Sequence, residues 1–210
     1  RVSIYPARFI PSKNELQIVS SITVRIKYND GEAINPKTTT KKQIAPSFAS
    51  VYKSLIFNYK EVLAAEYDGK EEGHEVLLCI MPDNFVEKFE PYATWKRQCG
   101  WEVIVTKFSD INATSSNPVI IRNYISTLYN NSENPPTYVM LVGDSDVLPV
   151  KIVTYPDYSF PDEDFFVKVA GVDFFPDIFL GRLPMQTTTR LEIFLKKCLM
   201  YEKTPYMGET

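Results

Sequence analysis

Residues 75–81, with the sequence EVLLCIM, decide the fold class of this chain of 210 residues. Six of these seven side chains are apolar and follow one another without a polar interruption. A strand with one wet face alternates apolar and polar residues, whereas a strand buried on both faces is apolar throughout. The stretch is therefore predicted to be a central strand of a parallel sheet. Its apolar run is the longest in the chain, yet far shorter than the roughly 18 residues that span a bilayer, so no membrane span is predicted.

Strand and helix patterns alternate from this stretch toward the carboxyl terminus. The predicted strands are residues 75–81, 101–106, 138–142, 164–169 and 175–183. The residues predicted to begin the helices between and after them are Asp83 or Asn84, Ser116, and Thr189, the last with Glu192 in a capping box. Pro91 lies inside the first helix and is predicted to kink or restart it. Such alternation is typical of βαβ crossovers, so the fold class is α/β with a mainly parallel sheet and helices on both faces.

Each predicted helix has an apolar face with helical spacing. The residues on these faces are Phe85, Phe89, Tyr92 and Trp95; Ile121, Tyr124, Ile125 and Leu128; and Leu191, Phe194, Leu195, Cys198 and Leu199. All are expected to point toward the core.

The amino-terminal part has a different pattern. Residues 1–30 are predicted to be β, because apolar and polar residues alternate over 22–28 and a turn at 11–14 separates an earlier strand. Residues 31–48 resemble a linker, a helix is predicted over 48–66 with Val51, Leu55, Tyr59, Val62 and Leu63 on one face, and 67–73 is polar. The predicted organisation is therefore 1–30 as the last strands of a β domain, 31–74 as linker and helix, and 75–205 as the α/β domain.

Charge and cysteine content exclude some functions. The formal net charge is −3, so no polyanion-binding surface is expected and nucleic acid is not predicted as a partner.

The three cysteines lack metal-site spacing, and Cys79 and Cys198 fall on apolar faces, where buried thiols without chemistry are expected. His74 is the single histidine and precedes the first core strand, where a catalytic base is not expected. No nucleophile–base pair is predicted within this chain, and whether it is an enzyme stays open.

Two acidic stretches are the candidate metal ligands. One is VGDSD at 142–146, after a predicted core strand, and the other is AGVDFFPD at 170–177. Hard cations prefer carboxylate and carbonyl oxygens. The candidate ligands are the carboxylates of Asp144, Asp173 and Asp177 and the carbonyls of Ala170 and Phe175. Loop caps and turn aspartates are the alternative reading of the same residues, and the run at 162–164 is interpreted as a solvated loop face.

Four patches of sequence stand out together: TYVMLVGDSDVLP at 137–149, TWKRQCG at 94–100, DFFPD followed by IFLGR at 173–182, and YEK at 201–203. In this order and spacing they resemble the gingipain family of cysteine peptidases. The resemblance runs from about residue 75 to 205. It implies a caspase-like fold of two subdomains, of which this chain covers the first. The family's catalytic His and Cys lie in the second subdomain, so the resemblance assigns no catalytic residue here.

The resemblance also implies a ligand, partners and a location. It implies a structural calcium ion on Asp144, Ala170, Asp173, Phe175 and Asp177, with Asp177 replacing the family's usual Glu. It implies that residues 1–30 end an inhibitory β prodomain, and that 31–48 and 64–74 are activation linkers of a zymogen. The expected partners are a protein or peptide substrate, the second catalytic subdomain and the chain's own prodomain. The expected location is secreted or at the cell surface.

Three functions therefore stay open. The first is part of a cysteine endopeptidase whose Cys–His dyad lies beyond this chain. The second is a non-catalytic, gingipain-like module with a structural or secretion-associated role, since a shared fold does not establish a shared activity. The third is a doubly wound domain of another class that binds a small molecule or a metal.

Overall fold

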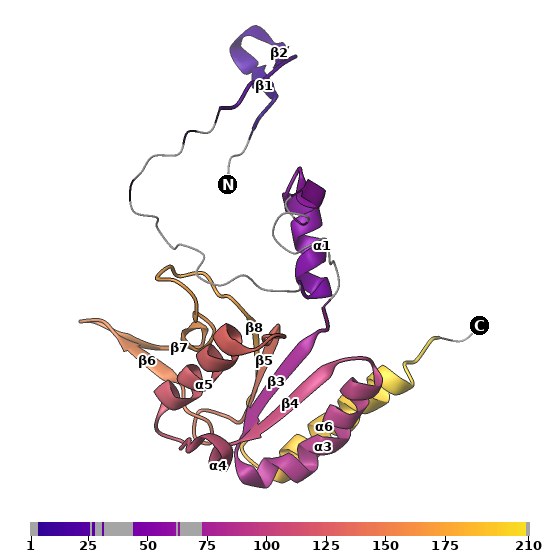
Figure 1. Ribbon diagram of the computed structural model, residues 1–210, viewed down its shortest axis with the longest axis vertical. Coiled ribbons are helices and arrows are strands. Elements are labelled where there is room, and N and C mark those ends of the chain that lie inside the picture. The colour runs from indigo at the N-terminus through magenta and orange to yellow at the C-terminus, as the bar shows by residue number, and fades with distance from the viewer. Residues whose placement is uncertain are drawn as a thin grey trace. The chain divides into compact units, whose positions relative to one another are not determined.

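The computed structural model describes residues 4–25, 27, 31, 44–61, 63 and 73–208. The chain divides into two compact units, Arg1–Ile34 and Asn35–Thr210 (Figure 1). The helix that follows the predicted linker therefore belongs to the same unit as the α/β domain.

The first unit contains an antiparallel hairpin. Strands β1, Ala7–Ile10, and β2, Glu15–Ile18, are joined by a 3-10 turn over Pro11–Lys13, which confirms the predicted turn. The strand predicted over 22–28 is wrong where it can be checked, since residues 22–25 are not in a strand and Ile22 and Val24 are exposed. An alternating pattern forms a strand only beside a hydrogen-bonded neighbour, and β1 pairs with β2 instead. Residues 26 and 28 lie outside the described residues.

The second unit is built on a parallel sheet of four strands. Their order is β4-β3-β5-β8, with β3 at Val76–Met81, β4 at Glu102–Lys107, β5 at Tyr138–Val142 and β8 at Phe179–Leu183. All six residues of β3 are buried. The prediction of a central parallel strand at 75–81 is confirmed, because a strand enclosed by neighbours and by two layers of helices needs apolar side chains on both faces.

Helices cover both faces of this sheet, as predicted. Helices α3, Val86–Gln98, and α6, Thr188–Lys203, pack side by side on one face (Figure 1). Helix α5, Pro118–Asn131, packs on the other face beside the short α4, Phe108–Ile111. No helix in the described part of the chain is long and apolar enough to cross a membrane.

The predicted core faces are largely confirmed. The buried members are Phe85, Phe89, Tyr92, Ile121, Ile125, Leu191 and Leu195. Tyr124, Leu128, Cys198 and Leu199 are partly buried and pack against the core. Phe194 was expected to be inside but is exposed, since it lies on α6 beside the packed stripe rather than within it.

Helix starts differ from the predicted caps. Asn117 rather than Ser116 caps α5, accepting a hydrogen bond from Val119 N at 3.1 Å. Thr187 rather than Thr189 caps α6, accepting from Arg190 N at 3.3 Å. An N-cap residue needs an extended backbone outside the helix, which Thr187 has at φ −136° and ψ 153°. Thr189 already lies within the first turn.

Helix α3 runs through Pro91 without the predicted restart. Pro91 is exposed, and at an exposed position the backbone hydrogen bond that proline removes is least costly, because water can replace it.

The segment between β5 and β8 departs most from prediction. Residues 151–162 form an unpredicted hairpin of β6, Lys151–Thr154, and β7, Ser159–Asp162. The strand predicted over 164–169 is instead a short 3-10 helix at Asp164–Phe166, and the strand predicted over 175–183 is shortened to β8. Arg122 on α5 donates to the carbonyls of Phe165 and Lys168 at 3.0 and 2.6 Å, so a side chain takes the place of a neighbouring strand.

The helix predicted over 48–66 is also shorter. Helix α1, Pro46–Leu55, ends at Ile56, whose backbone is extended, and helical residues resume at 59–61 and 63. The predicted single apolar face is therefore split. Ala49, Tyr59 and Leu63 are buried with Ile44, whereas Val51 and Leu55 are exposed and Val62 lies outside the described residues.

Candidate functional site

A nearly buried arginine organises the carboxyl end of the sheet, where parallel α/β folds place their sites. Arg182 Nη1 donates to the carbonyls of Gly143 and Leu148 at 2.8 and 3.0 Å, and Nη2 donates to that of Pro149 at 3.3 Å. Its Nε and Nη2 atoms also bind the two oxygens of Glu163 at 2.8 and 2.9 Å. The Arg182 side chain is 13% exposed. Bidentate pairing of this kind is strong and directional, so it holds the loop 143–149 in one geometry.

The sequence analysis did not predict the Arg182–Glu163 pair, although the sequence contains one indication of it. Arg182 stands within the apolar run 178–183, and a charged residue in a buried strand requires a partner. The partner, Glu163, lies in the acidic run that was interpreted as a solvated loop face. That interpretation is wrong for Glu163, which pairs with Arg182, but it is right for Asp164, whose side chain is 56% exposed. Asp162 and Asp164 lie 4.0 and 3.6 Å from Lys168 Nζ.

Gly143 makes the turn that follows β5. Its φ is +149°, and a Cβ atom built there would lie 2.9 Å from Leu148 Cβ, closer than real contacts allow. Its N–H donates to the carbonyl of Leu183 at 2.9 Å, and Asp144 N donates to that of Met185 at 3.1 Å. Glycine therefore lets the chain turn sharply while it keeps its pairing with the segment after β8.

Asp144 joins this turn to the start of α6. Its Oδ1 accepts from Ser145 N at 2.8 Å, and its Oδ2 accepts from Gln186 Nε2 at 3.0 Å. Gln186 Oε1 in turn accepts from Arg190 Nη1 at 2.6 Å. The carboxylate thus has a structural role at the carboxyl end of the sheet.

A second carboxylate at this end of the sheet also accepts two hydrogen bonds. Asp83, after β3, accepts from the backbone N–H of Ser109 at 3.1 Å and from the Ser109 hydroxyl. The hydroxyl hydrogen bond is the main cause that holds the pKa of Asp83 below its ordinary value. Asp83 is therefore an ionised acceptor at neutral pH rather than a proton donor.

The other predicted metal ligands lie at the amino end of the sheet. Asp177 precedes β8, and its Oδ2 accepts from Val169 N at 2.9 Å and from Ala170 N at 2.8 Å. Asp173 Oδ1 accepts from Phe175 N at 2.9 Å. These bonds close the loop 168–177 on itself, as expected for turn aspartates.

The structure brings Ala170 and Asp177 together but does not bring Asp144 to them. Asp144 follows β5 and Asp177 precedes β8, which pair in parallel register over five residues. At about 3.3 Å per residue the two carboxylates are at least ~15 Å apart. No group of three metal-ligating side chains converges in the part of the chain that the structure describes. The five residues therefore do not fit a single calcium site.

Thiols and imidazole are placed apart from one another. Cys79 is fully buried within β3, and burial raises the pKa of its thiol. Burial, followed by the nearby carboxylate of Glu202, also raises the pKa of Cys198. Cys99 and His74 are exposed, and among the described residues no hydrogen bond joins His74 to a cysteine. Neither Cys79 nor Cys198 has the lowered pKa of an activated nucleophile.

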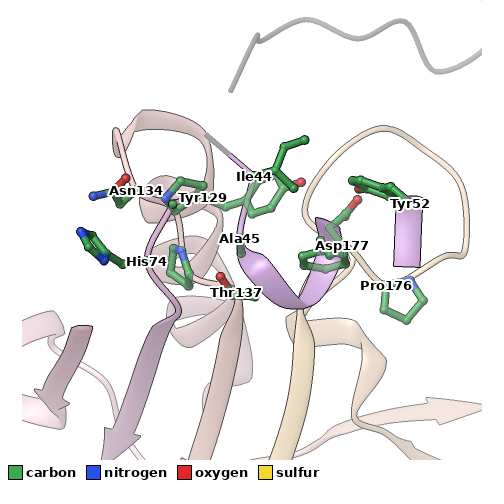
Figure 2. Close-up of a pocket in the computed structure, with 13 residues that line it drawn as sticks. Ile44, Ala45, Tyr52, His74, Tyr129, Asn134, Thr137, Pro176 and Asp177 are labelled. Carbon is green, nitrogen blue, oxygen red and sulfur yellow. The ribbon is translucent and has the colours of Figure 1, made fainter. Parts of the chain in front are cut away.

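A cavity of about 210 Å³ lies at the amino end of the sheet, between α1 and the segments that precede β3, β5 and β8. Figure 2 shows His74 and Asn134 on one side of it and Asp177 and Pro176 on the other. Thr137 lines the pocket between these two groups. Asp177 faces this cavity while its carboxylate holds backbone amides, so its charge is already partly compensated.

Two of the four sequence patches, at 94–100 and 201–203, meet at the carboxylate of Glu202. Glu202 on α6 accepts from Trp95 Nε1 at 2.8 Å and from Lys96 Nζ at 2.8 and 2.9 Å, and Tyr92 Oη lies 3.4 Å away. Burial disfavours the charge of Glu202, but the hydrogen bonds from Lys96 and Trp95 outweigh it and hold its pKa below the ordinary value. This contact fastens the end of α6 to the end of α3.

Comparisons with known proteins give a consistent result. The model of peptidase family C25 matches residues 70–210. Gingipain R2 of Porphyromonas gingivalis is 25% identical over 202 residues, which cover 96% of this chain and 26% of the relative. Lys-gingipain of the same organism is 22% identical over 213 residues, covering 96% of this chain and 12% of the relative. The chain thus spans about a quarter or less of these relatives.

Solved structures are similar to somewhat less than two thirds of this chain. A structure described as a protease superposes with a TM-score of 0.56 at 26% identity, covering 64% of this chain and 29% of that one. The complex of Porphyromonas gingivalis RgpB pro- and mature domains gives a TM-score of 0.54 at 26% identity, covering 61% and 29%. These similarities confirm the gingipain resemblance and the α/β, caspase-like fold that it implied.

Proposed function

Because the chain belongs to peptidase family C25, we propose that it is the amino-terminal portion of a gingipain-like cysteine endopeptidase. The observation that carries this proposal is the extent of the match, which includes every strand of the four-stranded sheet and both layers of helices. The Arg182–Glu163 pair and the Gly143 turn fix the carboxyl end of that sheet, which is the end where α/β enzymes build their sites.

The reaction itself is assigned to residues beyond this chain. In the proposed mechanism a cysteine thiolate attacks the peptide carbonyl, and a histidine protonates the leaving amine. The relatives support this division, because this chain covers only 26% of gingipain R2. The α/β domain described here then acts as the first subdomain, on which the second packs.

The amino-terminal unit is proposed to be the end of a prodomain, so that the protein is made as a zymogen. The supporting observations are the β1–β2 hairpin and the similarity to the RgpB structure, which contains pro- and mature domains. Activation cuts are expected in 31–48 or 64–74. A secreted or cell-surface location accompanies this proposal.

The test is peptide hydrolysis under reducing conditions by the longer protein that contains this chain and by the chain alone. Arginine- and lysine-containing fluorogenic peptides are used, with and without a thiol-alkylating reagent. We expect thiol-dependent cleavage by the longer protein and none by the 210 residues. No cleavage after removal of the amino-terminal segment would instead favour the non-catalytic module with a structural or secretion-associated role.

Calcium binding stays a prediction, restricted to Ala170, Asp173, Phe175 and Asp177. Because Asp177 Oδ2 already accepts two amides, a cation would use Oδ1 and carbonyl oxygens of the loop. Calcium at about 100 times its dissociation constant is expected to raise the melting temperature by roughly 5 °C, relative to a chelator. Asp144→Asn should keep this calcium-dependent shift and Asp177→Asn should lose it. An equal calcium-dependent rise in the melting temperature of both variants would rule out the loop 168–177 as the calcium site.

A further inference from the structure

The cavity at the amino end of the sheet contains a buried hydroxyl without a protein partner. Thr137, which directly precedes β5, is only 3% exposed and lines this cavity (Figure 2). Within the described part of the chain, its Oγ1 atom takes part in no hydrogen bond. Thr106, also buried, is by contrast hydrogen-bonded through Oγ1 to Tyr124 Oη at 3.1 Å. A buried hydroxyl without a partner is costly and uncommon in folded proteins, so that of Thr137 is a candidate contact for a molecule in the cavity.

The sheet fixes the position of this hydroxyl through the backbone. Thr137 N donates to the carbonyl of Val76 at 3.0 Å, and the Thr137 carbonyl accepts from Phe179 N at 3.0 Å. Neither bond uses the side chain, so a valine, which has the same branched shape, would keep both of them. The hydroxyl is therefore not needed for the pairing of the strands. Its position is set before any ligand arrives, as a binding site requires.

Asp177 supplies a negative charge to the same cavity. Its Oδ2 atom accepts from Val169 N and Ala170 N at 2.9 and 2.8 Å, and these two bonds fix the orientation of the carboxylate. Its Oδ1 atom accepts no hydrogen bond from the residues that the structure describes. Asp177 is the one acidic residue that lines the cavity, and neither lysine nor arginine is among the lining residues. A positively charged group is therefore favoured there over a negatively charged one.

The other walls of the cavity are mainly aromatic rings and prolines. The rings belong to Phe48 and Tyr52 of α1 and to Tyr129 of α5, and Pro135 and Pro136 precede Thr137. Aromatic faces attract cations, and proline has no N–H group that could compete for a cation's acceptor. The volume of about 210 Å³ exceeds that of an engineered cavity of about 150 Å³ that holds benzene, and is smaller than a drug-sized site. The cavity therefore fits a ligand of about ten non-hydrogen atoms.

We propose that this cavity is a binding site for a small organic cation with an amidinium, guanidinium or ammonium group. The cationic group donates to Asp177 Oδ1, the apolar body of the ligand lies against the rings, and the Thr137 hydroxyl accepts a further hydrogen bond. The site lies at the opposite end of the sheet from the loop that Arg182 holds. It does not rest on the proposed function, because it involves no peptide cleavage and lies wholly within this chain.

The test titrates the full chain of 210 residues with three probes of one shape and different charge. They are benzamidine, which is a cation, benzamide, which is neutral, and benzoate, which is an anion. Binding is followed by calorimetry and by NMR shifts, with a chelator present so that calcium does not compete for Asp177. We expect saturable binding of benzamidine with a dissociation constant of about 1 mM or lower, at least about tenfold tighter than that of benzamide. Equal binding of the two probes, or no saturation by benzamidine up to about 10 mM, would overturn the proposal.

Substitutions assign the binding to the two polar contacts. Asp177→Asn removes the charge but keeps an oxygen for the amides of the loop, and is expected to weaken benzamidine binding at least about tenfold. Thr137→Val removes one neutral hydrogen bond and should weaken it about fivefold. The matched controls are Asp144→Asn, at the other end of the sheet, and Thr189→Val, an exposed threonine of α6. Both controls should leave the dissociation constant unchanged.

The melting temperature distinguishes a ligand contact from a structural one. Because the Thr137 hydroxyl has no partner to lose, Thr137→Val should unfold at the same temperature as the unaltered chain or at a higher one. A clear decrease would show that the hydroxyl is already used by the fold and would contradict its role as a ligand contact. If Asp177→Asn and Thr137→Val bind benzamidine as tightly as the controls, the cation binds elsewhere and the cavity is not its site.

Discussion

The two ends of the parallel sheet are held by different kinds of interaction. At the carboxyl end, Arg182 donates to three carbonyls and pairs with Glu163, and these bonds depend on direction. At the amino end, Trp101, Tyr138 and Phe179 form a row of rings with centroids 5.2 and 5.1 Å apart, and α1 adds Phe48 to it. Ionic networks specify one geometry, whereas stacked rings tolerate small shifts. The difference suits a fixed loop at one end and a packed helix at the other.

Removing the arginine should break the carboxyl end most severely. Arg182→Met leaves Glu163 and three carbonyls without their donor in a mostly buried place, so the free energy of unfolding is expected to fall by about 3 kcal/mol. Urea unfolding measures the change. Lys197→Ala, an exposed substitution on α6, is the control and should stay within about 0.5 kcal/mol of the unaltered chain. An Arg182→Met loss as small as this control would show that the network does not hold the end together.

The turn after β5 gives the next largest effect. Gly143→Ala places a methyl group against Leu148 at a positive φ, and should lower the free energy of unfolding by about 2 kcal/mol. Gly181→Ala on β8 is the matched control, because nothing lies within 4 Å of its added Cβ. Equal stability of the two variants would mean that the turn relaxes without strain.

At the amino end the corresponding ionic contact is smaller and depends on pH. Glu202→Gln weakens the hydrogen bonds from Lys96 and Trp95 and should cost about 1.5 kcal/mol at pH 7. The folded-state pKa of Glu202 is lowered, so its stabilisation is complete above the ordinary value of 4.5 and is lost as the pH falls through the folded pKa. Unfolding curves of both proteins should converge in that acidic range. A constant difference down to low pH would contradict this ionic role.

The smallest predicted effect distinguishes two candidate N-cap residues of α6, Thr187 and Thr189. Thr187→Ala removes the side-chain cap seen in the structure and should cost about 0.5–1 kcal/mol, whereas Thr189→Ala should be nearly neutral. Thermal unfolding of the pair decides the matter. The opposite order would restore the capping box predicted from Thr189 and Glu192.

The prediction from sequence succeeded where a local pattern has a single structural cause. Residues 76–81 and 138–142 are apolar because both faces of those strands are covered, and both are strands of the sheet. It failed over residues 22–25, where alternation alone has no neighbouring strand to pair with. It also failed over 164–169, where Arg122 binds the carbonyls that a strand would have shared.

The candidate metal ligands show that a functional site is also difficult to predict from the sequence alone. The preference of hard cations for carboxylates, together with the family resemblance, grouped Asp144 with Asp173 and Asp177, but parallel pairing of β5 and β8 puts them at opposite ends of the sheet. The Arg182–Glu163 pair shows the converse case. A lone arginine in an apolar strand indicates that a partner exists, but only the folded chain identifies which carboxylate it is.

The sequence by itself determined the α/β class, the central strand, the helical layers and the family resemblance. These features depend on periodic burial and on local motifs, which involve residues close together in the sequence. The tertiary structure alone decided which charges meet, which end of the sheet each loop reaches, and that Thr137 and Asp177 line one cavity. The physical reason is that these contacts join residues far apart in sequence. Their energies depend on distance and direction in space, which no local pattern records.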